Sequence, residues 1–243
     1  MRTLILSDIH ANLTALEGVL ADAEPFDRVW CLGDVVGYGP NPNECVETIQ
    51  NLPEIQCVKG NHDAAIVGDI DIRAFNYEAR ASLAWLDEVL LPENKQWLRD
   101  LPDRLELDDI TLVHGSPRNP VWEYILDQTT AWENMAEFET KICLVGHTHI
   151  PCVFQLDNVK GNAAKVSFKK AGQVFSIDLK SIVNPGSVGQ PRDHNPKAAY
   201  ILYDDETEEW VYQRVGYDIE LVQKQILEAG LPHRHASRLL DGW

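Results

Sequence analysis

The sequence predicts an α/β fold in which two stacked β-sheets lie between outer layers of helices. Residues 2–91 alternate short apolar runs with segments of helical periodicity, a pattern typical of βαβ units and a largely parallel sheet. After Pro92 short β-like runs dominate, which indicates a second sheet. The 243 residues contain no repeat, low-complexity segment or linker, so we expect one domain over residues 1–243.

The first part of the chain predicts three strands and three helices. The strands are expected at residues 2–7, 27–32 and 55–58, and the helices at residues 13–20, 44–52 and 74–91. Asn12 is expected to cap the first helix, because Leu13, Leu16 and Val19 follow it at helical spacing. Pro92 is expected to end the third helix. The buried stripe expected for that helix consists of Trp85, Leu86, Val89 and Leu90.

The second part of the chain predicts mostly strands. They are expected at residues 104–107, 110–113, 142–145, 152–156, 164–168, 173–178, 181–184, 199–203 and 210–214. Helices are expected at residues 130–138, 218–229 and 233–240, the last two separated by a Gly-Leu-Pro break. This β-rich half would supply most of the second sheet.

Acidic residues outnumber basic residues by 38 to 21, giving a formal net charge of −17. A field of this sign repels nucleic-acid backbones and anionic membranes, and no basic cluster longer than Lys169-Lys170 offsets it. We therefore expect no extended nucleic-acid partner and no membrane partner. A small anionic substrate is compatible with this charge where bound metal ions supply local positive charge.

Apolar runs and cysteines indicate the cellular compartment. No run approaches the roughly 18 apolar residues of a membrane span, and the first ten residues become polar too quickly for a secretory signal. The cysteines are odd in number, form no CxxC pair, and are expected to be small buried hydrophobes in a reducing compartment. We therefore expect a cytoplasmic protein. These cysteines are Cys31, Cys45, Cys57, Cys143 and Cys152.

Polar motifs follow five of the predicted strands at the points where the strands end. The motifs are Asp8-x-His10, Gly33-Asp34, Gly60-Asn61-His62-Asp63, His114-Gly115 and Gly146-His147-Thr148-His149. Ligands of open α/β sheets bind outside the carboxyl ends of strands, so these side chains are expected to meet at one place. Together they contribute three Asp, one Asn and five of the eight histidines.

The ligand types in these motifs predict a transition-metal site. Carboxylates, imidazoles and an amide carbonyl, without a thiolate, suit Mn, Fe, Zn, Co or Ni better than Ca or Mg. Asp8 and His10 alternate on one strand end, so both are expected to point to the same side, as are His147 and His149. Asp34 could bridge two ions. Two ions would clamp the attacking and departing oxygens of a phosphoryl displacement.

The ordered set D-x-H, G-D, G-N-H-D, H-G and G-H-x-H, over residues 8–149, resembles the calcineurin-like metallophosphoesterase superfamily. Residues 184–193, with the sequence NPGSVGQPRD, are similar to a further segment of its small bacterial and archaeal phosphodiesterase-type members. The resemblance implies a four-layer α/β/β/α sandwich of two mixed sheets flanked by helices. This agrees with the two stacked sheets expected from the chain itself.

The resemblance also implies a centre of two divalent transition-metal ions, with Mn preferred and Fe, Zn, Ni or Co as alternatives. One ion would be held by Asp8, His10, Asp34 and His149. The second would be held by Asp34, Asn61, His114 and His147, with Asp34 as the bridge. His62 corresponds to the family histidine that contacts the phosphoryl group and protonates the leaving oxygen, a role that suits a group titrating near neutral pH.

One motif departs from the phosphoprotein-phosphatase branch, in which it reads G-D-x-x-D-R-G. Residues 33–39 here read GDVVGYG, so Gly37 replaces the acidic partner that would orient His62. Tyr38 replaces the arginine that would hold the phosphate. This difference argues against phosphoprotein phosphatase activity, and it leaves Asp63 as a candidate orienting partner.

Three further residues are candidate substrate contacts. Arg192 lies in a Gly/Pro loop where a guanidinium could bind a phosphate, although a surface salt bridge to Asp193 or another carboxylate would also explain it. Arg118, four residues after His114, has the same two explanations. Tyr38 could form a pocket wall or cover the sheet edge. The histidines expected to be ordinary surface groups are His194, His233 and His235.

These features predict a hydrolase of phosphate esters, with diesters favoured over monoesters. A metal-bridging hydroxide would attack phosphorus in line while His62 assists departure of the alkoxide. A phosphomonoesterase or nucleotide pyrophosphohydrolase is a second interpretation, and a non-catalytic metal-binding interaction module is a third. The expected partner is a small phosphoester substrate, and the sequence indicates no particular oligomeric state.

Overall fold

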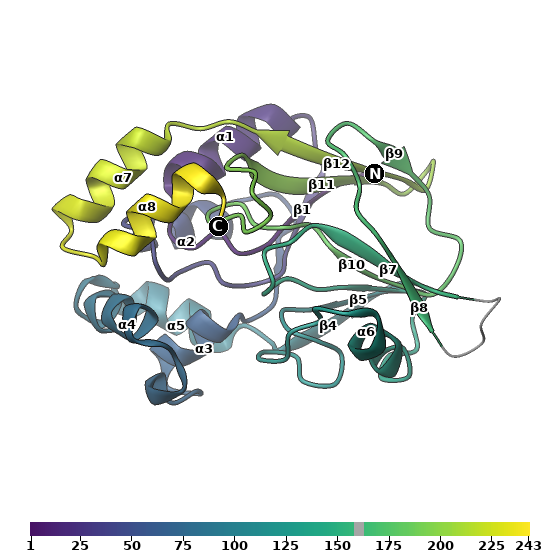
Figure 1. Ribbon diagram of the computed structural model, residues 1–243, viewed down its shortest axis with the longest axis horizontal. Helices are drawn as coiled ribbons and strands as arrows, with labels where there is room; N and C mark the ends of the chain where they lie inside the picture. Colours follow the sequence, from purple (N-terminus) through teal and green to yellow (C-terminus); the bar gives the residue numbers. More distant parts are fainter. Residues whose placement is uncertain (158–162) are drawn as a thin grey trace.

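The computed structural model describes residues 1–157 and 163–243 and contains two six-stranded sheets (Figure 1). The first sheet has the order β3-β2-β1-β11-β12-β9. Its strands are β1 (Arg2–Leu6), β2 (Arg28–Cys31), β3 (Gln56–Cys57), β9 (Val174–Phe175), β11 (Ala198–Asp204) and β12 (Glu209–Val215). Strands β1, β2 and β3 are parallel, whereas β11, β12 and β9 join by antiparallel pairing.

The second sheet has the order β4-β5-β6-β10-β7-β8. Its strands are β4 (Arg104–Leu107), β5 (Ile110–Val113), β6 (Ile142–Leu144), β7 (Cys152–Leu156), β8 (Ala164–Ser167) and β10 (Ser181–Asn184). Strands β5, β6 and β10 run parallel, and the remaining pairs are antiparallel. Both sheets are therefore mixed, which confirms the sequence prediction.

Helices flank the two sheets, with α1 against the first sheet and α6 against the second (Figure 1). They are α1 (Leu13–Ala23), α2 (Pro42–Gln50), α3 (Asn61–Val67), α4 (Tyr77–Val89), α5 (Pro92–Asp100), α6 (Gln128–Asn134), α7 (Ile219–Glu228) and α8 (His233–Asp241), with a 3₁₀ turn η1 (Ile72–Ala74). Apolar residues of α1, α2, α4 and α5 form one core with the first sheet, and α6 packs on the second. Helices α7 and α8 share a smaller core of their own.

The alternation of side chains along each strand produces the layers. In β1, Ile5 belongs to the core between the two sheets, while Leu4 and Leu6 point into the core under the helices. Leu112 of the second sheet also belongs to the core between the two sheets. The predicted four-layer α/β/β/α sandwich is confirmed.

The region after β3 differs from the sequence prediction. The single helix expected over residues 74–91 is η1 followed by α4, and Pro92 begins α5 instead of ending helical structure. Proline is favoured at the first helical position, where its missing N–H costs nothing. The expected stripe is also shifted, because Trp85 and Val89 are only half-buried. The buried residues of α4 are Ala79, Ser82, Leu83 and Leu86.

Two other expectations are confirmed. The Asn12 side chain accepts a hydrogen bond from Ala15 N at 3.1 Å and caps α1. All five cysteines are buried and unpaired. No helix in the described part of the chain is both long and apolar enough to cross a membrane.

Candidate metal centre

The five strand-end motifs meet at one place in the fold. They follow β1, β2, β3, β5 and β6, whose parallel arrangement brings their carboxyl ends to the same edge of each sheet. All eight metal-ligand and catalytic candidates lie here, and none is more than 4% exposed. They are Asp8, His10, Asp34, Asn61, His62, His114, His147 and His149.

Several of these residues have left-handed backbone conformations. Asp8, His10 and Asp34 have φ values of 54°, 50° and 52°, and His147 and His149 have 65° and 60°. Non-glycine residues rarely adopt this region, and such strain is found preferentially at functional sites. Main-chain hydrogen bonds hold the two neighbouring strand ends together, including Asp8 N to Gly33 O at 3.0 Å and His10 N to Asp34 O at 2.9 Å.

The side chains form two adjoining groups. In the first, His149 Nε2 lies 3.1 Å from His10 Nε2 and 3.2 Å from Asp8 Oδ1. In the second, His114 Nε2 lies 3.2 Å from His147 Nδ1 and 3.0 Å from Asn61 Oδ1.

Asp34 lies between the two groups. Its Oδ2 is 3.6 Å from His10 Nε2 and 3.4 Å from His114 Nε2. Its other oxygen, Oδ1, accepts the main-chain N–H of His62 at 2.8 Å. One carboxylate oxygen is thus anchored to the backbone and the other faces both groups.

Each of the four outer imidazoles is anchored through one ring nitrogen to a main-chain carbonyl. His10 Nδ1 contacts Val36 O at 3.2 Å, His149 Nδ1 contacts Gln190 O at 2.6 Å, His114 Nδ1 contacts Leu32 O at 2.8 Å and His147 Nε2 contacts Trp122 O at 3.1 Å. A carbonyl only accepts, so each of these nitrogens carries the hydrogen. In the neutral ring the other nitrogen then has a free lone pair. All four lone pairs face the shared centre, an arrangement typical of metal-binding histidines.

This donor set fits divalent cations. The unprotonated Nε2 atoms of His10 and His149 face each other at 3.1 Å, where two lone pairs repel unless a cation lies between them. Among the described residues, no group donates a hydrogen bond to the buried Asp8 Oδ1. Three groups of side chains place one ligand atom each within 4.8 Å of the others: Asp8, His10 and His149; His10, Asp34 and His62; and Asp34, His114 and His147.

The electrostatics of the centre follow from burial and from the carboxylates. Burial alone would raise the pKa of Asp34, but the adjacent His114 and His62 imidazoles outweigh it and hold the pKa well below its usual range. Burial tends to lower the pKa of His114, but Asp34 outweighs that effect and raises it to about 9. The carboxylates therefore attract positive charge into the centre. A divalent cation would supply that charge in place of a proton on His114.

His62, the second residue of α3, lies beside this centre without a polar partner for Nδ1 among the described residues. A Cβ atom at Gly37 would lie 2.6 Å from this nitrogen, so the glycine leaves room for the ring. Phe75 and Tyr38 contact the ring edgewise, with centroids 5.0 and 4.4 Å away. Burial lowers the pKa of His62 to about 4.

Asp63 does not orient His62 in this structure. Its carboxylate accepts the main-chain N–H groups of Gly60 at 2.9 Å and Val36 at 3.2 Å, which ties the start of α3 to the loop after Asp34. Among the described residues it forms no hydrogen bond with the His62 ring. No helix was expected between residues 58 and 74, but the capping interaction of Asp63 starts α3 directly after β3.

The candidate substrate contacts have different surroundings. Tyr38 lies against His10, with ring centroids 4.6 Å apart, and lines a cavity together with Arg192. Asp193 pairs with Arg214, so the salt bridge considered for Arg192 is not formed. Arg118 is instead held by two glutamates. Its guanidinium is 2.5 Å from Glu123 and 3.2 Å from Glu133.

Sequence reasoning missed several residues near the centre. His235 was expected on the surface, but it is 2% exposed, because it lies on the buried side of α8 and packs against Tyr38 with ring centroids 4.8 Å apart. Tyr124 stacks on His147, with centroids 3.6 Å apart. Arg234 and Arg238 line the same cavity as Tyr38. Their spacing of four residues in a predicted helix indicated that both side chains lie on the same face of the helix. It did not indicate that this face lies beside the candidate metal centre.

Comparisons with known proteins agree with this geometry. The calcineurin-like phosphoesterase superfamily domain matches residues 1–208. An uncharacterized protein of Methanocaldococcus jannaschii is 36% identical over 247 residues, covering 98% of this chain and 97% of that protein. A metallophosphoesterase from Sphaerobacter thermophilus superposes with a TM-score of 0.92 at 44% identity, covering 100% of both chains.

A more distant similarity covers about half of the chain. The symmetrical bis(5′-nucleosyl)-tetraphosphatase of Glaesserella parasuis is 28% identical over 130 residues, which are 51% of this chain and 47% of that enzyme.

Proposed function

Since the chain belongs to the calcineurin-like phosphoesterase superfamily, we propose that it is a metal-dependent phosphodiesterase with a centre of two divalent ions. Mn is the preferred metal, with Fe, Zn, Ni and Co as alternatives. One ion would be bound by Asp8, His10, Asp34 and His149. The other would be bound by Asp34, Asn61, His114 and His147.

The observation that carries this proposal is the orientation of the four imidazoles. Each ring is fixed through a hydrogen bond to a main-chain carbonyl. The free nitrogens of His10, His114 and His149 face oxygens of Asp8, Asp34 or Asn61, and that of His147 faces His114 Nε2 at 3.2 Å. A packing role alone does not explain four buried lone pairs that face one another. Asp34, whose Oδ2 lies near rings of both groups, is the natural bridge.

In hydrolysis, water adds to phosphorus, the bond to one ester oxygen breaks, and that oxygen takes up a proton. When bound, two divalent ions would activate a water molecule and stabilise the charge that develops on the phosphoryl oxygens. Asp34 holds the two groups at a fixed spacing, because Oδ1 is tied to His62 N. Burial lowers the pKa of His62, which favours the neutral ring before substrate binds. The negative charge of the bound ester favours its protonated form, from which it donates to the departing oxygen.

The test is hydrolysis of bis-p-nitrophenyl phosphate and p-nitrophenyl phosphate by Mn-loaded protein, with metal content measured on the same sample. We expect a preference for the diester and about two ions per chain. Asp34→Asn should lose most activity and metal. Asp178→Asn, an exposed aspartate, is the matched control and should retain both. Equal activity in the Asp34→Asn protein would refute the bridging role.

A second candidate is a nucleotide pyrophosphohydrolase. The similarity to a bis(5′-nucleosyl)-tetraphosphatase favours it over a simple phosphomonoesterase. A panel of nucleotides, monoesters and diesters separates these activities by kcat/KM.

The five unpaired buried cysteines support a cytoplasmic location.

A further inference from the structure

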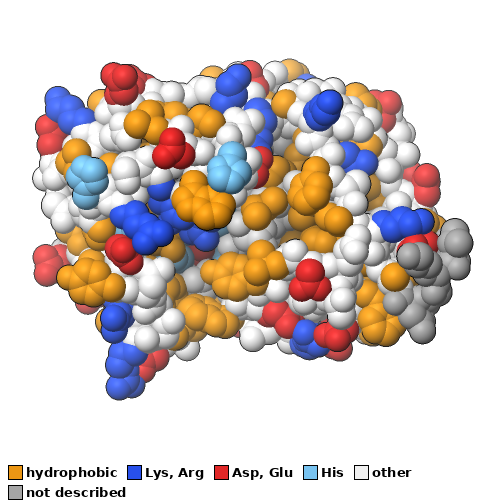
Figure 2. Space-filling view, viewed as in Figure 1, with side chains coloured by type: hydrophobic (Ala, Val, Ile, Leu, Met, Phe, Trp, Pro, Cys, Tyr) orange, Lys and Arg blue, Asp and Glu red, His pale blue; other side chains and the backbone are white. Residues whose placement is uncertain are grey.

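Three arginines surround a cavity of about 240 Å³ beside the proposed metal centre. Arg192 comes from the loop after β10, and Arg234 and Arg238 come from α8. Glu78 is the single carboxylate among the lining side chains. This is a concentration of positive charge in a chain whose net charge is −17. Figure 2 shows Lys and Arg side chains gathered over α8, bordered by hydrophobic side chains.

The positive charge of these arginines is incompletely compensated. Arg234 Nη1 is 3.5 Å from Glu78 Oε1. Within residues 1–157 and 163–243, neither Arg192 nor Arg238 pairs with a side-chain carboxylate. Arg192 Nη2 donates to Gln190 Oε1 at 2.9 Å, while its buried Nε has no partner there. Arg238 Nε donates to the main-chain oxygen of Trp243. Several N–H donors thus remain available to an anion.

The cavity adjoins the metal centre without being part of it. Arg192 N donates to His149 O at 3.4 Å, and its guanidinium carbon lies 6.0 Å from the centroid of Tyr38. The Tyr38 ring also contacts His10 and His62, with ring centroids 4.6 and 4.4 Å away. An anion bound by the arginines would therefore lie next to the proposed ions, one ring away from their ligands.

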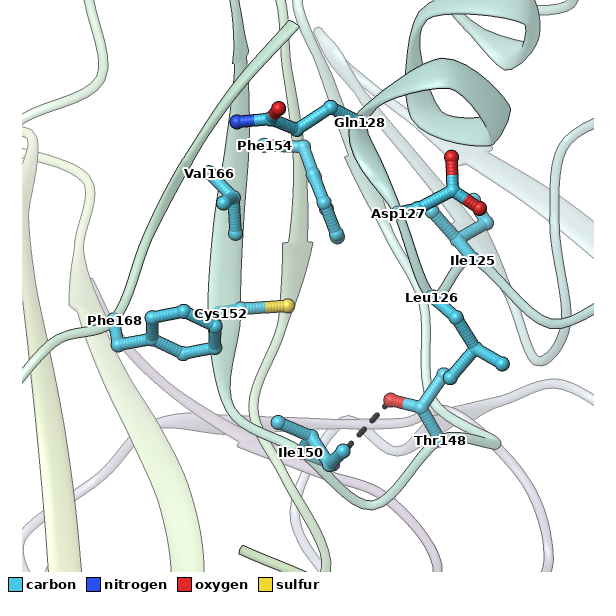
Figure 3. A pocket seen from close by; sticks show the side chains of 10 residues that line it. All are labelled: Ile125, Leu126, Asp127, Gln128, Thr148, Ile150, Cys152, Phe154, Val166 and Phe168. Atoms are coloured by element: carbon cyan, nitrogen blue, oxygen red, sulfur yellow. Dashed lines mark hydrogen bonds between the residues drawn. The ribbon is translucent and has the colours of Figure 1, made fainter.

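An apolar hollow continues from the arginines. A cavity of about 380 Å³ is lined by all three arginines and by Leu126 and Ile150. Leu126 and Ile150 also line a third cavity of about 350 Å³. Figure 3 shows that the third cavity is bounded on its other side by Phe154 and Val166. Volumes of this size are typical of small-molecule sites.

We propose that Arg192, Arg234 and Arg238 bind a second phosphate group of the substrate, while the apolar hollow holds its organic part. The natural substrate is then an organic diphosphate or polyphosphate, such as a nucleoside or dinucleoside polyphosphate. Guanidinium groups match phosphate oxygens in paired hydrogen bonds, which explains arginine in place of lysine at all three positions. Arg192 lies within the matched residues 1–208, whereas Arg234 and Arg238 lie beyond them. The inference rests on the proposed function, because it assigns a substrate class to the same site.

The first test compares kcat/KM for bis(5′-adenosyl) tetraphosphate with kcat/KM for bis-p-nitrophenyl phosphate, which has one phosphate. We expect Arg238→Gln to lower the ratio of these two values at least ten-fold, mainly through KM, because a charge-assisted hydrogen bond is lost. Arg238→Lys should lower it less. Arg73→Gln, which removes an exposed charge of equal sign, is the control and should leave the ratio unchanged. An unchanged ratio in Arg238→Gln would overturn the proposal.

The second test is independent of catalysis. Binding of inorganic tripolyphosphate to metal-free protein is measured by calorimetry, after circular dichroism has verified the fold. We expect binding that weakens at least ten-fold in Arg238→Gln and not in Arg73→Gln. Equal binding by the wild type and Arg238→Gln, or none by the wild type, would refute the subsite. If the arginine-dependent binding is present but no phosphoester is hydrolysed, the proposed function fails while the anion site stands.

Discussion

Gly37 determines where the His62 ring lies, and Gly37→Ala should therefore separate catalysis from folding. A Cβ at residue 37 would lie 2.6 Å from His62 Nδ1, whereas ordinary contact begins near 3.4 Å. The ring would have to retreat by roughly 0.8 Å. A displacement of about 1 Å at a reacting group costs on the order of 100-fold in rate. We expect kcat to fall 10- to 100-fold, by order of magnitude.

Gly68→Ala is the matched control, since Gly68 ends α3, the helix that carries His62. The two glycines have similar φ values, 98° and 92°, so both substitutions have a backbone cost of roughly 1 kcal/mol. Among the described residues, no neighbouring atom lies within 4 Å of a Cβ at residue 68. The free energy of unfolding should fall by roughly 1–3 kcal/mol more in Gly37→Ala than in Gly68→Ala, because the added methyl group overpacks the His62 site.

The assay is kcat for bis-p-nitrophenyl phosphate with Mn-loaded proteins of equal metal content, and urea unfolding gives the stability of each variant. Full kcat in Gly37→Ala, with stability alone reduced, would refute the idea that catalysis depends on the position of His62. An equal loss of kcat in Gly68→Ala would show that backbone strain is the cause.

Three other perturbations test the centre and its surroundings. Adding Mn to metal-free protein should raise Tm, because a free Mn concentration of 100 times Kd increases the free energy of unfolding by about 2.7 kcal/mol. Asp34→Asn should remove most of the rise in Tm, and an equal rise in the variant would contradict the ligand assignment. Burial lowers the pKa of His235 to about 4, below its unfolded value near 6.5, so its contribution to stability is lost as pH falls between these values. Between pH 7 and 4.5 the free energy of unfolding of His235→Gln, measured with urea, should therefore fall by roughly 2 kcal/mol less than that of the wild type. Equal decreases in the two proteins would refute this. Asn184 Nδ2 donates hydrogen bonds to Gly146 O at 2.6 Å and to Thr148 Oγ1 at 3.0 Å. Asn184→Ala should therefore lower the free energy of unfolding by roughly 3 kcal/mol in the same assay, and a decrease of less than about 1 kcal/mol would contradict a stabilising role for these two hydrogen bonds.

Most strands were predictable because their signal is local. The apolar runs at β1 and β5 predict buried strands without knowledge of distant residues. The errors lie where two local signals compete. Pro92 is compatible with either a helix end or a helix start, and the choice depends on how α5 packs against α2 and α3.

The sequence by itself determined the ligand types, their positions at strand ends and hence the family, because each motif is a few consecutive residues after an apolar run. Only the tertiary structure decided which groups face one another. It showed that Asp63 caps the start of α3 instead of orienting His62, and that Gly37 leaves His62 Nδ1 without a partner among the described residues. It also brought Arg234, more than forty residues beyond Arg192, to the same cavity. Such contacts depend on how helices and loops pack across the whole chain, which no local pattern specifies.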